Sequence, residues 1–132
     1  MNINFVDIVC GLNWGDEAKG KLVAHMVKCN HYDFVCRWAG GNNAGHTIYK
    51  DGIKYKTHLI PCGIFYGVNS IIGPDCVLHV ESAFKELKYL EENGFDISLI
   101  KISSKAHIIT QEHIDIDIAK YKDQGTTLSG IA

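Results

Sequence analysis

The sequence lacks the features that mark membrane, secreted and disulfide-bonded proteins. None of its apolar runs approaches membrane-spanning length, and no secretory segment opens it. Its five cysteines are odd in number and have no Cys-x-x-Cys spacing, which argues against a disulfide framework or a zinc site and favours a reducing cytoplasm. A net charge of −2 gives no overall attraction to nucleic acid. The 132 residues therefore predict one globular domain's worth of chain, with neither a membrane nor nucleic acid as partner.

Glycine and lysine gather in one stretch, Gly11–Lys21. An apolar run precedes it and helically spaced apolar residues follow it, which predicts a strand, a loop and a helix. The match to the G-x-x-x-x-G-K phosphate-loop pattern is made by Gly15, Gly20 and Lys21. Glycine N–H groups, the helix dipole and the lysine charges all attract phosphate. Asp16 is unusual there, because a carboxylate among anion-binding groups needs a metal ion or a proton-transfer task.

A second glycine-rich stretch follows at residues 37–47, with three glycines, two asparagines and a histidine. Taken alone, the first stretch could be an ordinary strand-to-helix turn with a solvated Asp-Glu pair, and His46 an ordinary loop histidine bonded to backbone. Short polar loops of the second kind carry function more often than packing. The two stretches together therefore favour a functional site over a plain turn.

Both stretches closely resemble the adenylosuccinate synthetase family. That family is similar in its W-G-D-E-G-K-G-K loop, its G-G-x-N-A-G-H-T loop and an H-L-I-P-x-G-I segment, which stand here at residues 14–21, 40–47 and 58–64. The resemblance runs over essentially all of the chain and includes Gly125-Thr126-Thr127. It implies a GTP-dependent ligase of purine biosynthesis that joins L-aspartate to IMP. It also implies that residues 1–132 are the amino-terminal part of a single, longer GTP- and IMP-binding domain, apparently truncated at its carboxyl end.

The apolar pattern predicts strands alternating with helices. Strands are expected at residues 5–10, 34–37, 70–72, 76–78 and 97–103, with a turn at 73–75 and helices over about 22–27 and 80–93. Asp51-Gly52 predicts the turn of a hairpin between residues 47–49 and 53–55. In residues 114–119 strand and helix compete, and the resemblance favours helix. Cys10 and Cys36 are expected in the core.

This pattern predicts an α/β fold. We expect a mainly parallel central sheet with flanking helices, like that of P-loop NTPases, and a small antiparallel hairpin excursion.

The resemblance assigns three residues to the chemistry. Asp16 matches the base that removes the N1 proton of IMP, and His46 matches the acid that donates to the bridging oxygen of GTP. Lys19 is expected to stabilise the charge of the transferring phosphoryl group.

The resemblance also implies binding residues and a metal. GTP would contact Gly15, Asp16, Glu17, Ala18, Lys19, Gly20, Lys21, Gly45, His46 and Thr47. IMP would contact Asp16, Glu17, Ala18, Lys19, Asn43, Ala44, Gly45, His46 and Thr127. Mg²⁺ would be held by the Asp16 carboxylate and the backbone carbonyl of Gly45. The family further implies a homodimer.

Two positions depart from the family. Ala18 replaces a glycine, and its Cβ is harmless only if φ is negative. Leu128-Ser129 stand where a glycine followed by a basic or small residue is common, which affects the IMP-phosphate contacts. Two alternatives stay open: a 2-aminoadenylosuccinate synthetase-like relative that acts on (d)GMP, and a non-catalytic nucleotide-binding fragment. The retained Asp16 favours IMP over a guanine nucleotide.

Overall fold

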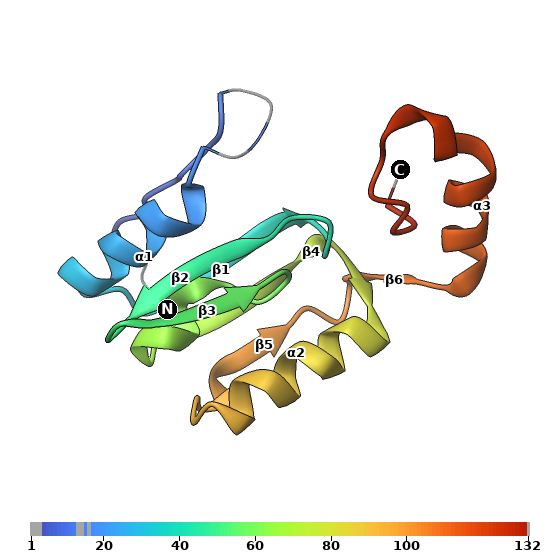
Figure 1. Cartoon of the computed structure of the whole chain (residues 1–132). Coiled ribbons are helices and arrows are strands. Elements are labelled where there is room, and N and C mark those ends of the chain that lie inside the picture. Colours follow the sequence, from blue (N-terminus) through green and yellow to red (C-terminus); the bar gives the residue numbers. More distant parts are fainter. Residues whose placement is uncertain (1–3, 13–14, 16, 132) are drawn as a thin grey trace.

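The computed structural model describes residues 4–12, 15 and 17–131 (Figure 1). Its elements in chain order are α1 (Lys19–Cys29), β1 (Phe34–Gly40), β2 (His46–Lys50), β3 (Ile53–Thr57), β4 (Asn69–His79), α2 (Val80–Glu92), β5 (Ile100–Ile102), β6 (His107–Ile109) and α3 (Gln111–Tyr121). Short 3-10 turns lie at Cys62–Tyr66, Ile97–Leu99 and Lys122–Gln124.

Strand β4 is the centre of the parallel sheet. β1 pairs along one side of it, and β5 and then β6 pair with successive parts of β4, all in parallel. β2 and β3 form a separate antiparallel hairpin (Figure 1). Its turn residues Asp51 and Gly52 both have positive φ, 52° and 79°, the type I′ geometry that Asp-Gly favours. The predicted α/β fold with a hairpin excursion is therefore confirmed.

The hairpin is fixed to the rest of the molecule through its apolar face. Ile48 and Tyr55 are 2% and 7% exposed, whereas Lys54 points to solvent, as the alternation predicts. The Tyr55 ring packs against Phe65 and Phe95, with centroids 5.3 and 5.0 Å away. This core holds the start of β2, and hence His46, in place.

Three sequence predictions about strands are wrong. Residues 4–12 form no strand, and Phe5, Val6 and Ile8 are 60–75% exposed. A parallel strand is buried only where other strands and helices cover it, and no strand of the described residues pairs with this segment. Cys10 and Cys36 are accordingly exposed rather than in the core.

The predicted turn at residues 73–75 is the second error, because β4 runs through it. Pro74 lacks an N–H, and it lies where the β1–β4 register shifts between Arg37 and Ala39, so its missing donor is tolerated. The third error concerns residues 97–103, where a 3-10 turn precedes a strand limited to Ile100–Ile102.

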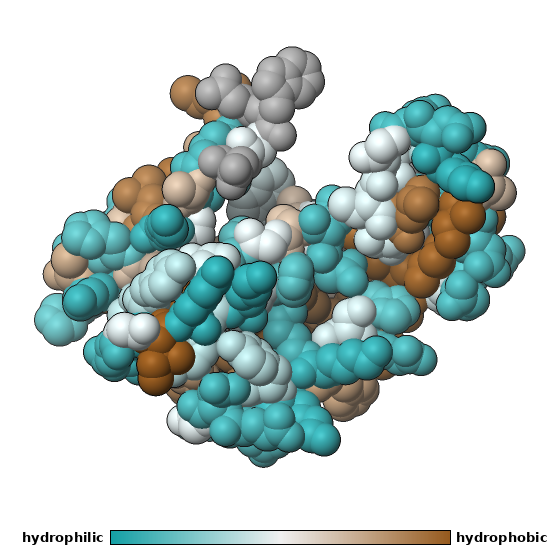
Figure 2. All heavy atoms as spheres, in the orientation of Figure 1, coloured by the Kyte–Doolittle hydropathy of each residue, from teal (hydrophilic) through white to brown (hydrophobic). Residues whose placement is uncertain are grey.

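The helices follow the sequence more closely. α2 ends at Glu92, close to the predicted end, and is followed by Gly94 with φ 81°, the left-handed conformation that glycine often adopts after a helix. Phe84, an apolar residue of this helix, is 67% exposed. Residues 114–119 lie in α3, which leaves Ile116 and Ile118 at the surface. Figure 2 shows hydrophobic spheres among hydrophilic ones in the region of α3 and the loop that follows it.

Candidate functional site

The start of α1 has the geometry of an anion site. Ala18 precedes the helix with φ 59° and ψ 26°, and it supplies no capping side chain. The N–H groups of the first turn have no partner within an α-helix, and the dipole places partial positive charge there. Gly20 and Lys21 lie in this turn, and Lys21 is exposed. The predicted phosphate loop therefore leads into a helix, as expected.

Lys19 is paired with a carboxylate in this structure. Its Nζ bonds to Glu17, and both side chains are partly buried. A Cβ on Gly11 would lie 2.6 Å from the Glu17 oxygens and 2.7 Å from Lys19 Nζ, so a larger residue there would displace the ends of both side chains. Glu17 thus holds the Lys19 side chain at the N-terminal end of α1.

His46 packs against the first turn of α1. A Cβ built on Gly20 would lie 2.9 Å from His46 Nδ1, so the two glycine-rich stretches touch at this point. Burial lowers the pKa of His46, and electrostatic interaction with Arg37, His58 and Lys19 lowers it further. An imidazole surrounded by cations is in a place suited to an anionic ligand.

The loop before His46 is held by His58. His58 Nδ1 lies 3.1 Å from the carbonyl oxygen of Ala44, and its ring lies 3.6 Å from where a Cβ on Gly45 would be. Asn43 and Gly45 are exposed, and Thr47 is partly buried at the start of the hairpin. The predicted contacts to nucleotide on this loop are therefore accessible.

The Gly125–Thr127 motif lies on the loop after α3, which contacts the second glycine-rich stretch. A Cβ on Gly41 would lie 2.7 Å from Ile131 Cδ1, which places the loop after α3 against the start of the second glycine-rich stretch. The carboxylate of Asp117, 3% exposed, accepts a hydrogen bond from Gly130 N at 2.8 Å. Thr127 is exposed on this loop.

Both departures from family glycines have left-handed backbone. Ala18 has φ 59° and Leu128 has φ 51°. The condition under which the Ala18 Cβ would be harmless is therefore not met, and the same holds for Leu128, so both positions are strained.

The structure brings His46, Lys19 and Gly20 together, while Asp16 lies outside the described residues. Sequence reasoning gave no role to four residues that organise the loops, which are Arg37, His58, Glu86 and Asp117. For Glu86 a signal exists, since a charged residue on the apolar stripe of α2, between Ala83 and Leu90, is unusual.

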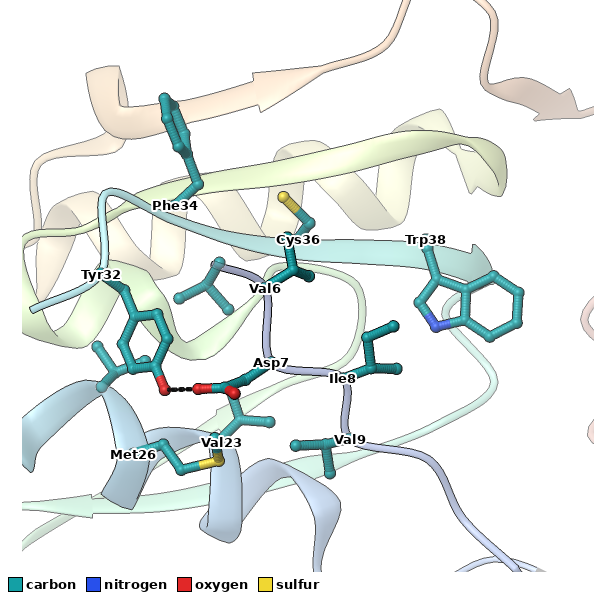
Figure 3. A pocket seen from close by; sticks show the side chains of 12 residues that line it. Val6, Asp7, Ile8, Val9, Val23, Met26, Tyr32, Phe34, Cys36 and Trp38 are labelled. Atoms are coloured by element: carbon teal, nitrogen blue, oxygen red, sulfur yellow. Dashed lines mark hydrogen bonds between the residues drawn. The ribbon is translucent and has the colours of Figure 1, made fainter. Parts of the chain in front are cut away.

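A pocket lies away from these residues. A groove of about 480 Å³ runs between residues 6–9, α1 and β1 (Figure 3). Figure 3 shows mainly apolar side chains around it, together with the hydrogen bond from Tyr32 to Asp7. None of the residues predicted to bind nucleotide lines this groove. The groove lies beside β1, with which residues 5–10, predicted to form a strand, do not pair.

Comparison with known proteins agrees with the motifs. The profile of the adenylosuccinate synthetase family matches residues 8–132. The chain is 45% identical over 124 residues to the adenylosuccinate synthetase of Listeria monocytogenes, covering 93% of this chain and 28% of that protein. The adenylosuccinate synthetase of Brevibacillus brevis is 44% identical over the same length.

Two solved structures share the fold. The fully ligated adenylosuccinate synthetase from Plasmodium falciparum matches with a TM-score of 0.80 and 36% identity, over 92% of this chain and 30% of that one. Succinoaminodeoxyadenylate synthetase of cyanophage S-2L, bound to dGMP and to dATP as an energy donor, matches with a TM-score of 0.67 and 25% identity, over 89% of this chain and 33% of that one.

The parallel sheet and the loop-to-helix site define an α/β protein with P-loop-like architecture. Within that class, the chain belongs to the adenylosuccinate synthetase family, a family of ligases in purine biosynthesis. It spans 28% of the length of the relatives that it matches. In the part of the chain that the structure describes, no helix is long and apolar enough to cross a membrane.

Proposed function

We propose that the protein catalyses GTP-dependent ligation of L-aspartate to IMP in the cytoplasm. The observation that carries this proposal is the packing of His46 against the first turn of α1, in a chain of this family. It joins an acid–base side chain to a helix start that suits phosphate. Residues 1–132 would form the amino-terminal part of one GTP- and IMP-binding domain, which would act as a homodimer.

The reaction would proceed in two steps. The γ-phosphoryl group of GTP passes to the 6-oxygen of IMP as GDP leaves and Asp16 accepts the N1 proton. The amine of aspartate then attacks C6, and phosphate leaves with the 6-oxygen. Phosphoryl transfer needs positioned positive charge more than covalent help. The α1 N–H groups, Lys19 and Lys21 would supply that charge to GTP, and Thr127 would bind the phosphate of IMP.

His46 would donate to the oxygen that bridges the β- and γ-phosphates. Burial and then the neighbouring cations lower the pKa of His46, which disfavours its protonated form. A bound triphosphate brings the opposite charge, which favours that form as the bond to GDP breaks. Lys19 would at the same moment exchange its contact with Glu17 for the transferring phosphoryl group.

Magnesium suits the oxygen donors that the family resemblance implies. Among the described residues, no three His, Cys, Asp or Glu side chains group to hold a metal ion. By the family resemblance, an ion here would take two protein ligands, the Asp16 carboxylate and the Gly45 carbonyl, with phosphate oxygens in addition. Mg²⁺ prefers such hard oxygen donors, and when bound it would neutralise phosphate charge.

Turnover by the complete gene product that carries this chain tests the proposal. With GTP, L-aspartate and Mg²⁺, we expect IMP to give adenylosuccinate, and Asp16→Ala and His46→Ala each to abolish turnover while GTP binding largely survives. Near-normal rates in either variant would contradict the assigned roles. Turnover of dGMP but not IMP would assign the chemistry named for the cyanophage protein, and no turnover of either would indicate a non-catalytic nucleotide-binding protein.

A further inference from the structure

Glu86 is the only charged residue among the buried residues of α2. It is 9% exposed and shares the buried face of the helix with Ala83 and Leu90. A buried carboxylate is unfavourable unless hydrogen bonds replace the water that it has lost. The hydrogen-bond partners of Glu86 therefore indicate which part of the structure it stabilises.

Those partners are three consecutive backbone N–H groups. Glu86 Oε1 accepts from His58 N and from Ile60 N, each at 3.0 Å. Leu59 N lies 3.1 Å from Oε2 and 3.3 Å from Oε1. One side chain on α2 thus fixes the peptide units that directly follow β3.

Arg37 of β1 holds the same segment by its carbonyl groups. Its Nη1 donates to the carbonyl of His58 and, at 3.4 Å, to that of Leu59. Its Nη2 donates to the carbonyl of Gly41, in the second glycine-rich stretch. The segment therefore lies between an anion at its N–H groups and a cation at its carbonyl groups, an arrangement that fixes its orientation.

The held segment touches the proposed site at two points. The His58 ring reaches Ala44 O, one residue before Gly45. Thr57, the residue before the segment, pairs with His46 across the hairpin. A displacement of the segment would therefore move the loop that carries His46.

We propose that Glu86 is a positioning residue, whose carboxylate holds the His58–Ile60 backbone and, through it, the Gly40–Thr47 loop in the geometry for phosphoryl transfer. This inference rests on the proposed function. In this role Glu86 acts through the backbone that it binds.

Asp117 provides a matched comparison. It is also a buried carboxylate that accepts a backbone N–H, but it holds the loop that carries Thr127. Glu91, exposed on the same helix as Glu86, provides a control for charge removal alone. If Glu86 and Asp117 only stabilised the fold, changing either of them would affect kcat and KM in the same way.

The experiment measures kcat and KM per folded molecule for Glu86→Gln, Glu86→Asp, Asp117→Asn and Glu91→Gln in the complete gene product, below the melting temperature of each. In Glu86→Gln we expect kcat to fall about 100-fold, the order of effect that a misplaced site produces, with KM for IMP changed by less than about threefold. Glu86→Asp should recover part of the rate. Asp117→Asn should mainly raise KM for IMP, and Glu91→Gln should match the wild type.

Hydrogen exchange gives a second readout that needs no turnover. The amides of His58, Leu59 and Ile60 should exchange faster in Glu86→Gln than in Glu91→Gln. Two results with an active wild type would overturn the positioning role. One is a kcat for Glu86→Gln within about twofold of the wild-type kcat, and the other is an equal effect of Glu86→Gln and Asp117→Asn on kcat and KM. An inactive wild type would instead overturn the proposed function, and with it the inference that rests on it.

Discussion

His46 Nδ1 lies 2.9 Å from the position that a Cβ on Gly20 would occupy. The imidazole therefore rests on the backbone of the first turn of α1, where only glycine leaves it room. This contact joins the two glycine-rich stretches into one site. The absence of a side chain at Gly20 therefore matters mainly for the placement of the His46 ring, and less for the stability of the helix.

Gly20→Ala tests that contact. Alanine has a higher helix propensity than glycine, so the helix itself does not require glycine at this position in the first turn. The added methyl group must displace His46, and we expect kcat for IMP to fall at least about 10-fold. Lys28→Ala, at the exposed end of the same helix, should leave the rate unchanged. Wild-type activity in Gly20→Ala would show that His46 need not rest there.

Backbone strain at Ala18 predicts a stabilising change. Left-handed backbone costs a residue with a Cβ about 1 kcal/mol, and glycine avoids that cost. Ala18→Gly should therefore raise the free energy of unfolding, measured by urea denaturation. Ala119→Gly makes the same chemical change within α3 and should lower it by about 1 kcal/mol. If both variants moved in the same direction, the strain would not be real.

Leu128→Gly should stabilise the protein for the same reason, since Leu128 has φ 51°. A bulky residue is less tolerant of this conformation than alanine, so we expect a gain of at least about 1 kcal/mol. Loss of buried contacts at this partly buried position would offset some of it. A lower free energy of unfolding for Leu128→Gly would show that side-chain packing outweighs the strain.

The thiols should separate into two reactivity groups. Burial raises the pKa of Cys62 to about 11, whereas Cys10 and Cys29 are exposed. Because the thiolate is the reacting form, at pH 8 roughly one Cys62 in a thousand is reactive. A disulfide reagent at pH 8 should modify Cys10 and Cys29 quickly and Cys62 slowly, with the Cys62 rate rising toward pH 11. Equal rates for Cys29 and Cys62 in the folded protein, followed by mass spectrometry of peptides, would contradict the burial.

Local patterns predicted the local structures. Asp51-Gly52 predicted the turn of the hairpin, although both strands run further from the turn than predicted, and the apolar spacing predicted α2 to within a residue. Long-range pairing overrode composition elsewhere. Gly73 and Pro74 resemble a turn, but the register shift opposite them on β1 lets β4 continue. Residues 5–10 have the apolar run of a buried strand, but burial depends on neighbours that no local pattern supplies.

The site divides in the same way. The glycines, Lys19 and His46 could be predicted as site residues because each of the two loops carries its own sequence motif. The contacts of Glu86 join residues 26–28 positions apart, and those of Arg37 cross from β1 to the segment after β3. Only the fold brings such pairs together, so the sequence alone did not reveal that Glu86 is buried or which groups it binds.

Transfer of the 6-oxygen tests the central claim most directly. The complete gene product would be given IMP labelled with ¹⁸O at the 6-position, together with GTP, L-aspartate and Mg²⁺, and the released phosphate would be analysed by mass spectrometry. If the joined loops place phosphate on that oxygen, the label leaves in inorganic phosphate as adenylosuccinate forms. Product formed with unlabelled phosphate would contradict the account.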